Sequence, residues 1–324
     1  MTHAIRIHSI GRPEVLKWEE VTVGAPAPNE VRLKATAIGL NYIDTYHRSG
    51  LYKIPLPSVL GREAAAVVEE IGSAVTDLKV GDRVAYAASP IGAYAEARLM
   101  LADKLVKIPA GISDNQAASM MLKGMTAQYL LRRIHPVKPG DTILMHAAAG
   151  GVGLILCQWA RHLGATVIGT VGSDEKIALA KTYGCDHVIN YVKEDFVARV
   201  AEITGGKKCN VVYDGVGKDT FLKSLDCLAP TGVAALFGQS SGGVDPLNLG
   251  LLAQKGSLFM TRPSMFPYIV TRAQLLETAN DLFDVVKSGA VKISVTATYP
   301  LRDAAQAHRD LEGRKTTGSI VLVP

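Results

Sequence analysis

The sequence predicts an α/β protein with two domains, a β-rich, partly open barrel and a doubly wound parallel sheet. Three observations predict this fold class. The chain has 324 residues, about twice the usual length of one domain. Short alternating strands separated by glycine and aspartate fill its first hundred or so residues. From Asp141 onward, apolar strands alternate with helical segments, which is the pattern of βαβ units.

The first domain is predicted from strands that are short and alternate in polarity. They are expected at Ala4 to His8, Val31 to Ile38, Ala64 to Ile71 and Arg83 to Ala87. At Ser113 the pattern changes, because Ser113 and Gln116 form a capping box before an apolar-rich helix that runs to Leu131. We expect this helix to mark the crossing between the domains.

The second domain is predicted from strands that each precede a helix. The strands are expected at Thr142 to His146, Ala165 to Val171, Val188 to Asn190, Asn210 to Asp214 and Gly232 to Phe237, with helices from Gly153, from Ser173, near Glu194 and near Thr220. A second capping box, Thr271 and Gln274, opens a long helix, and a strand from Gly318 to Val323 returns to the first domain. We therefore assign residues 1–123 and 263–324 to the first domain and 124–262 to the second.

Composition and charge narrow the class of protein. Apolar residues make up 48% and charged residues 20%, as in soluble globular proteins. The net charge of +5 is modest and is spread along the chain, so nucleic acid is not an expected partner, although the excess of Lys and Arg leaves weak backbone binding open. No apolar run has the length of a membrane span, and no secretion signal begins the sequence. We expect a cytoplasmic protein.

The four cysteines, Cys157, Cys185, Cys209 and Cys227, lie far apart in the sequence. They form no C-x-x-C pair of the kind that binds metal or performs redox chemistry. We therefore expect buried free thiols.

The clearest chemical signal is the turn Ala147-Ala148-Ala149-Gly150-Gly151-Val152-Gly153, which lies between an apolar strand and an apolar helix. In the G-x-G-x-x-G pattern of dinucleotide-binding folds, Ala148 replaces the first glycine. Gly150 allows the backbone to approach a pyrophosphate, and Gly153 allows the helix to pack close to the strand. The alternative is a tight turn that only packs helix against sheet.

The end of the next strand indicates which dinucleotide binds. An acid about 20 residues on would hold the ribose of NAD, but this strand ends in Val171-Gly172-Ser173. Ser173 can donate a hydrogen bond to a 2′-phosphate and Lys176 can neutralise it, which favours NADPH. The alternative is that Ser173 caps a helix and Lys176 is solvated.

Several separate segments give the chain a resemblance to the medium-chain dehydrogenase/reductase superfamily over essentially its full length. They are Gly61 to Ala65, Gly81 to Val84, Gly124 to Ala127, the Ala-Ala-Gly-Gly-Val-Gly turn and Gly313 to Gly318. The resemblance implies a GroES-like catalytic domain and a Rossmann nucleotide-binding domain. It also implies a homodimer, since relatives commonly pair the edge strands of their nucleotide-binding domains.

The zinc ligands of the alcohol dehydrogenases in this superfamily are missing. Catalytic zinc needs thiolate and imidazole ligands, and the positions that resemble them hold Asn41 and Arg62. The cysteine cluster of the structural zinc is also absent. We therefore expect no metal, and an acceptor that takes a hydride readily without a Lewis acid.

Two segments, Asn41 to Tyr52 and Phe237 to Gly242, resemble the zinc-independent quinone oxidoreductases, a family that includes zeta-crystallin. The resemblance implies residues that bind NADPH and places Asn41 and Thr126 at the nicotinamide. The implied cofactor-binding residues are Asn41, Thr126, Ala149, Gly150, Gly151, Val152, Gly153, Ser173, Lys176, Tyr191, Phe237, Gly238, Ser240 and Arg314.

The expected reaction is hydride transfer from NADPH, bound between the domains, to a small-molecule quinone. Tyr46 and Tyr52 are the candidate hydrogen-bond donors to the product oxygen, with Asn41 as the third catalytic candidate, although each tyrosine could equally be an aromatic wall. Hydroquinone oxygens can take protons from solvent, so a dedicated acid is not required. His47 is a candidate acid, but a single histidine in a loop is usually a surface or packing residue. Arg48 could steer anionic groups, but such residues are more often solvated or structural.

Two other functions remain open. A reductase of α,β-unsaturated aldehydes or ketones would use the same hydride. A role of another class, binding RNA or serving as an abundant crystallin-like protein, finds little support, because no basic stripe interleaved with aromatics occurs.

Overall fold

A computed structural model describes residues 2–87 and 90–324. The chain divides into two compact units, one of residues 1–125, 269–283 and 293–324 and the other of residues 126–268 and 284–292. The predicted boundaries differ from these units at three places: residues 263–268 and 284–292, the latter including the end of a long helix, fall in the second unit, and residues 124–125 fall in the first.

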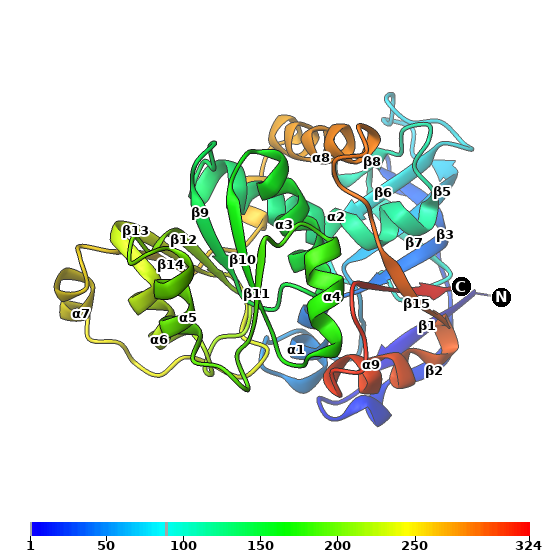
Figure 1. Cartoon of the computed structure of the whole chain (residues 1–324). Coiled ribbons are helices and arrows are strands. Elements are labelled where there is room, and N and C mark those ends of the chain that lie inside the picture. The colour runs from blue at the N-terminus through cyan, green and yellow to red at the C-terminus, as the bar shows by residue number, and fades with distance from the viewer. Residues whose placement is uncertain (1, 88–89) are drawn as a thin grey trace. The chain divides into compact units, whose positions relative to one another are not determined.

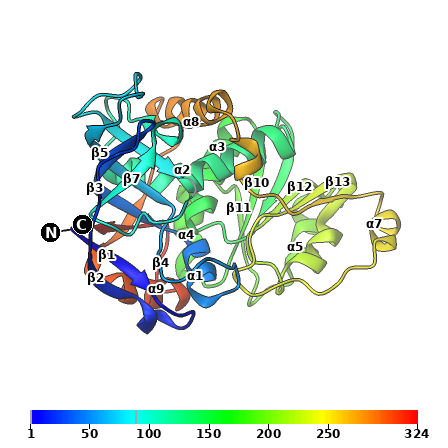
Figure 2. The ribbon, with the colours of Figure 1, turned by 180° about the vertical axis from the view of Figure 1, so that it is seen from behind.

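The first unit consists mainly of strands. Its elements are β1 (Thr2–Ile7), β2 (Lys17–Val21), β3 (Glu30–Leu40), α1 (Tyr42–Ser49), β4 (Ser58–Val59), β5 (Glu63–Ile71), β6 (Arg83–Ala87), β7 (Ala97–Leu101), β8 (Val106–Lys107), β15 (Val295–Pro300), α9 (Ala304–Glu312) and β16 (Ser319–Val323), with short 3-10 turns at Pro13–Val15, Ala102–Lys104 and Leu301–Asp303. The strands predicted from alternation are confirmed as β1, β3, β5 and β6. Figure 2 shows the β1–β2 pair and the longer strands β3 and β5 of this unit.

Two sheets build the barrel of this unit. The larger has the order β15-β16-β3-β5-β6-β8, with β7 paired to β3, and the smaller has the order β2-β1-β4. The long strand β3 runs antiparallel to both β5 and β7. Alternate residues of these strands, including Val31, Leu33 and Val68, enter one apolar core, because successive side chains of a strand point to opposite faces.

The second unit is a parallel sheet with helices. Its elements are β9 (Thr142–Met145), α3 (Gly151–His162), β10 (Thr166–Val171), α4 (Glu175–Thr182), β11 (His187–Asn190), α5 (Phe196–Ile203), β12 (Cys209–Asp214), α6 (Phe221–Ser224), β13 (Leu228–Leu236), α7 (Gly250–Gln254) and β14 (Phe259–Thr261), with short helical turns at Leu130–Ile134, Leu225–Cys227 and Phe266–Tyr268. Figure 1 shows α3 and α4 together on one side of this sheet. Residues of α5 and α6 share an apolar core with the other face.

The strand order of this sheet is β11-β10-β9-β12-β13-β14. Every neighbouring pair is parallel. The chain moves outward from β9 to β11 and then restarts at β12 on the other side, so the order reverses between β9 and β12. Ligands of doubly wound sheets bind at this switch point, outside the carboxyl ends of the strands.

Two long helices, α2 (Asp114–Tyr129) and α8 (Arg272–Lys287), each contain one of the points at which the chain passes between the units. Both predicted capping boxes are confirmed. Gln116 N donates to Ser113 Oγ at 3.2 Å and Ser113 N donates to Gln116 Oε1 at 3.0 Å. Thr271 and Gln274 make the same reciprocal bonds ahead of α8. Within residues 2–87 and 90–324, none of the helices combines the length and apolar composition that a bilayer span requires.

Candidate active site

The glycine-rich turn joins β9 to α3. Gly150 occupies the N-cap position, where it has no side chain to bond the helix, and α3 begins at Gly151. Gly150 N donates to Ala147 O at 2.9 Å, and Ala148 N donates to Thr170 O of the neighbouring strand at 2.9 Å. The left-handed conformation falls on Ala147, with φ of 56°, one residue before the position that matches the first glycine. The turn is thereby held by its own backbone.

This turn fits a phosphate group. The first N–H groups of a helix have no partner inside the helix, and no side chain caps those of α3. The first turn of α3 contains no acid, so the positive end of its dipole is not cancelled. Ala149, Gly150, Gly151, Val152 and Gly153 are the residues that would hold the pyrophosphate.

Gly153 has a different role from Gly150. A Cβ at Gly153 would lie 2.4 Å from Ala147 O and 2.5 Å from Ala148 O, whereas one at Gly150 would lie 3.1 Å from Ala147 O. Only glycine at position 153 lets α3 approach the strand end so closely. The prediction that Gly153 serves helix–strand packing therefore has a direct steric cause.

The end of β10 carries the residues predicted to select the nucleotide. Ser173 and Lys176 are half-buried, and Lys176 lies in the first turn of α4. The interpretation of Ser173 as the helix cap is wrong, because Asp174 occupies the N-cap position. Tyr191, at the end of β11, places its hydroxyl over this strand end, 3.5 Å from where a Cβ on Gly172 would lie.

The loops after β12 and β13 meet at the same edge of the sheet. A Cβ on Gly238 would lie 2.6 Å from Gly215 O, and the Phe237 ring lies against Gly215. Ser240 N donates to Gly215 O at 3.2 Å, and Asp214 accepts the N–H groups of the loop that follows β12. Because all the strands are parallel, the turn and the residues Ser173, Lys176, Tyr191, Phe237, Gly238 and Ser240 gather at the carboxyl edge of one sheet.

In the first unit, Asn41 is the N-cap residue of α1. Its side-chain nitrogen donates to Glu63 Oε2 at 2.7 Å, and Lys123 Nζ lies 3.3 Å from the same oxygen. Glu63 Oε1 accepts Leu122 N at 2.8 Å. Asn41, Glu63 and Lys123 are all buried, so the carboxylate is fully engaged by donors. The amide nitrogen of Asn41 therefore points to Glu63, while its side-chain oxygen faces the backbone N–H of Asp44 in the capping box of α1.

The tyrosines of this region form an aromatic cluster on α1 and the segment after it. The rings of Tyr46 and Tyr52 meet edge to face with centroids 5.2 Å apart, and Tyr42 packs against Tyr46 at 5.5 Å. Tyr52 N donates to Tyr46 O at 3.1 Å, which fixes the segment to the helix. Tyr46 is buried and Tyr52 half-buried. The structure thus brings Asn41, Tyr46 and Tyr52 to one short helix and its end.

A buried polar chain supports this helix from within. Arg48 donates to His308 Nδ1 at 2.9 Å, His308 Nε2 lies 3.0 Å from Tyr94 Oη, and Tyr94 donates to Asp44 Oδ2 at 3.0 Å. Because Arg48 can only donate, His308 accepts at Nδ1 and donates from Nε2 to Tyr94. Asp44 also accepts Asn41 N at 2.9 Å, so the chain ends at the helix N-terminus.

Burial shifts the pKa of three members of this chain, raising that of Tyr94 as well as shifting those of Asp44 and His308. It raises the pKa of Asp44 to about 7, against the hydrogen bonds from Asn41 N and Tyr94. It lowers the pKa of His308 to about 3, helped by the charge of Arg48. His308 is therefore neutral over the physiological range.

Arg48 and His47 are not exposed. Arg48 is 2% exposed and pairs with Glu312 of α9 through Nη1 and Nη2 at 2.9 and 2.7 Å, so its structural reading holds and its solvated one is wrong. Figure 2 shows α1 beside α9. The loop placement of His47 is wrong, since it lies buried in α1. Burial and the charge of Arg62 lower its pKa to about 4, so His47 is a neutral imidazole at neutral pH and does not serve as an imidazolium acid.

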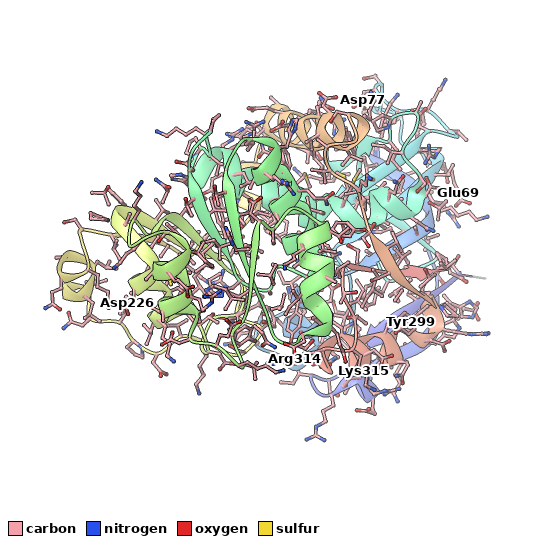
Figure 3. The ribbon with its side chains drawn as sticks, viewed as in Figure 1. Glu69, Asp77, Asp226, Tyr299, Arg314 and Lys315 are labelled. Atoms are coloured by element: carbon pink, nitrogen blue, oxygen red, sulfur yellow. The ribbon has the colours of Figure 1, made fainter. Side chains whose placement is uncertain are left out.

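Two predicted residues lie elsewhere in the chain. Thr126 is a buried residue of α2 and belongs to the second unit. Arg314 belongs to the first unit and is exposed, with φ of 57°. Arg314 and Lys315 follow Gly313, the C-cap residue of α9, and Figure 3 labels both.

Comparison with known proteins gives the family. The alcohol dehydrogenase GroES-like domain matches residues 27–110, and the zinc-binding dehydrogenase domain matches residues 151–284. Quinone oxidoreductase 1 of Escherichia coli K12 is 53% identical, with 100% of both chains covered. The chain belongs to the zinc-independent quinone oxidoreductases of the medium-chain dehydrogenase/reductase superfamily.

Solved structures of the family agree with this fold. The crystal structure of the Escherichia coli quinone oxidoreductase complexed with NADPH superposes with a TM-score of 0.97 at 53% identity and covers 100% of both chains. A 2-haloacrylate reductase from Burkholderia sp is also 53% identical, with 100% of this chain and 99% of the relative covered. The family therefore contains close relatives of this chain with two kinds of named substrate.

The family model that matches the second domain is named for zinc binding. In this chain, the positions that resemble zinc ligands hold Asn41 and Arg62, and both side chains make other contacts. The amide nitrogen of Asn41 donates a hydrogen bond to Glu63, and Arg62 Nη2 lies 3.3 Å from His47 Nε2. Among the residues that the structure describes, no three His, Cys, Asp or Glu side chains come together in a group that could hold a metal ion. The four cysteines are free and buried, as predicted.

Sequence reasoning missed two features of this quinone oxidoreductase. It did not single out Glu63 and Lys123, which fix the amide of Asn41. It also did not find that Asp174, next to Ser173, is paired with residues of β11 and the turn after it. The one available signal was an acid in an apolar strand, Glu63, since buried carboxylates need partners.

Proposed function

We propose that this chain transfers a hydride from NADPH to a quinone without zinc. The carboxyl edge of the second unit's sheet is the observation that carries this function. There an uncapped helix N-terminus would hold a pyrophosphate, and the stretch Val171-Gly172-Ser173, which itself contains no acid, would hold a phosphorylated ribose. When bound, NADPH supplies the hydride from its nicotinamide.

The chain's own residues bind and orient. Ala149 to Gly153 would hold the pyrophosphate, Ser173, Lys176, Tyr191 and Arg314 the adenosine phosphate, and Phe237, Gly238 and Ser240 the rest of the cofactor. Asn41 and Thr126 would border the nicotinamide. The fixed Asn41 side chain, held by Glu63 and by the capping box of α1, supports its part of this assignment, because a group held in one orientation is already positioned when the cofactor binds.

Tyr46 and Tyr52 are proposed as hydrogen-bond donors to the oxygen that becomes negative as the quinone is reduced. Their edge-to-face packing holds both rings in place. A histidine acid is not part of the proposal, because His47 and His308 are neutral at physiological pH. The hydroquinone oxygens take their protons from solvent.

Reduction of an electron-poor alkene is the second candidate. It is supported by the 53% identity to a 2-haloacrylate reductase, which equals the identity to quinone oxidoreductase 1 of Escherichia coli. Both reactions deliver a hydride to an acceptor conjugated with a carbonyl group and need no Lewis acid. The two candidates differ in the acceptor and share the cofactor site.

A homodimer formed through β14 is also proposed. This short strand ends the six-stranded sheet, and its Phe259 and Met260 are 63% and 40% exposed. An apolar edge strand is a template for pairing with a second copy. We also propose a cytoplasmic location, which four free cysteines support because reducing compartments keep thiols reduced.

The test is to follow NADPH oxidation with each class of acceptor offered alone: 1,4-benzoquinone, 9,10-phenanthrenequinone, a short 2-alkenal and 2-chloroacrylate. We expect the highest kcat/KM with a quinone. Turnover of the alkenal or the haloacrylate without quinone turnover would transfer the assignment to the alkene reductases. Absence of NADPH oxidation with every acceptor would contradict both.

A further inference from the structure

Asp174 is an acid placed where the proposed function requires none. It follows Ser173 directly and precedes Lys176 by two residues, so it borders the proposed 2′-phosphate site. An ionised carboxylate at this strand end accepts the ribose hydroxyls of NADH and repels the extra phosphate of NADPH. Its state therefore bears on which cofactor the chain prefers.

Both oxygens of Asp174 are engaged by residues at the end of β11. Asn190 Nδ2 donates to Oδ1 at 2.7 Å, and the Lys193 ammonium pairs with Oδ2. These two hydrogen bonds, the one from Lys193 first, lower the pKa of Asp174, and Asp174 in turn raises the pKa of Lys193. The carboxylate is ionised and its charge is matched by a cation.

Asn190 is a fixed partner. It is 3% exposed, and its position in β11 is set by parallel pairing with Val171, the last residue of β10. Its side-chain oxygen accepts Val192 N at 3.1 Å, so its nitrogen is the atom that remains for Asp174. The backbone carbonyl oxygen of Asn190 accepts a hydrogen bond from Lys193 N at 3.0 Å, which keeps Lys193 in the same turn.

We propose that Asn190 and Lys193 set the cofactor selectivity of this chain by engaging Asp174. Asn190 and Lys193 engage the carboxylate oxygens of Asp174, which would otherwise accept the ribose hydroxyls of NADH. The positive charge of Lys193 also offsets the negative charge of Asp174, which would repel a 2′-phosphate. Neither residue needs to touch the cofactor for this effect. The inference rests on the proposed NADPH function and adds the residues that protect its selectivity.

The experiment is a double-mutant cycle read by binding. Calorimetry measures the affinity of the unliganded protein for 2′,5′-ADP and for 5′-AMP, which differ only in the 2′-phosphate. Lys193→Met should lower the affinity ratio of 2′,5′-ADP to 5′-AMP by up to about fivefold, the upper end of what an exposed charge pair contributes. In an Asp174→Asn background the same substitution should change the ratio less than about twofold, because no carboxylate remains to be neutralised.

Control variants separate charge from side-chain shape. Lys193→Arg keeps the cation and should keep the affinity ratio of 2′,5′-ADP to 5′-AMP. Lys207→Met removes an exposed lysine beyond α5 and should also leave this ratio unchanged. The ratio of kcat/KM for NADPH to kcat/KM for NADH should follow the binding ratio in every variant.

Three results would overturn the proposal. A full loss of selectivity from Lys193→Met in the Asp174→Asn background would mean that Lys193 acts on the phosphate directly. An unchanged ratio in the natural background would mean that Lys193 has no part in selectivity. If the unaltered protein bound neither NADPH nor 2′,5′-ADP, the proposed function would fail and this inference with it, whereas NADPH binding with an inert Lys193 would defeat the inference alone.

Discussion

The side-chain amide of Asn41 donates a hydrogen bond to Glu63 Oε2 at 2.7 Å, and both residues are buried. Lys123 Nζ lies 3.3 Å from the same oxygen and also donates to Leu40 O at 3.2 Å. The buried carboxylate of Glu63 is therefore stabilised by the amide of Asn41 as well as by the ammonium group of Lys123. A residue at a position that resembles a zinc ligand here completes a buried hydrogen-bond network.

Replacing Asn41 by Ala should destabilise the protein by about 1–3 kcal/mol, because Glu63 Oε2 loses a donor in a buried site. Urea unfolding measures the change. Asn115→Ala, at an exposed position of α2, is the control and should cost less than about 0.5 kcal/mol. A loss of similar size in both variants would show that the contact between Asn41 and Glu63 contributes little.

Lys176→Ala should weaken the binding of NADPH far more than that of NADH, by roughly 5- to 150-fold for a lost charged hydrogen bond of about 1–3 kcal/mol. Fluorescence titration of the reduced cofactors gives both constants. Lys181→Ala, on an exposed position of the same helix, serves as the matched control. Equal losses for NADPH and NADH would remove Lys176 from the 2′-phosphate site.

Asp44 should make the stability depend on pH in an unusual direction. Its pKa of about 7 in the folded protein exceeds the value of about 3.9 in an unfolded chain. A raised pKa contributes stability that is fully present below the unfolded value and is lost as pH rises through the folded value. The contribution of Asp44 therefore decreases between about pH 4 and pH 7.

The comparison of the unaltered protein with Asp44→Asn isolates this effect from the histidines, whose lowered pKa values act in the opposite direction. The free energy of unfolding of the variant relative to the unaltered protein should rise by roughly 1–3 kcal/mol between pH 5 and pH 8. Urea unfolding at both pH values gives the difference. A relative stability independent of pH would mean that Asp44 titrates outside this interval.

Phe259→Glu should shift the protein from dimer to monomer, because a carboxylate on each copy of β14 would be brought into the proposed edge pairing. Sedimentation velocity at several concentrations reports the state. Val192→Glu alters a residue of similar exposure, 66%, in the turn after β11, and should leave the dimer intact. A monomeric unaltered protein, or an intact Phe259→Glu dimer, would contradict the proposed interface.

The sheet of the second unit and its glycine turn were predictable because their signals are local. Apolar runs, helix caps and Gly150 to Gly153 follow one another within short stretches of sequence, and the predicted strand positions agree with β9 to β13 to within a few residues. The parallel order then places Ser173, Tyr191 and Phe237 at one edge without further information.

Helix α1 was not predicted, since its stability comes from distant partners. It buries Asp44, His47 and Arg48, which no apolar periodicity would mark as core residues. Arg48 pairs with Glu312, which lies 264 residues further along the chain, and Asp44 accepts a hydrogen bond from Tyr94, 50 residues away. The pairing of Asn190 and Lys193 with Asp174 escaped notice for the same reason, because it depends on the register of β10 and β11.

The central claim is NADPH-dependent quinone reduction without zinc, and the most direct test is steady-state oxidation of NADPH and of NADH with 9,10-phenanthrenequinone, with and without a zinc chelator. The account predicts quinone turnover, a kcat/KM that is higher with NADPH than with NADH, and no effect of the chelator. Loss of turnover on chelation, or equal use of both cofactors, would contradict it.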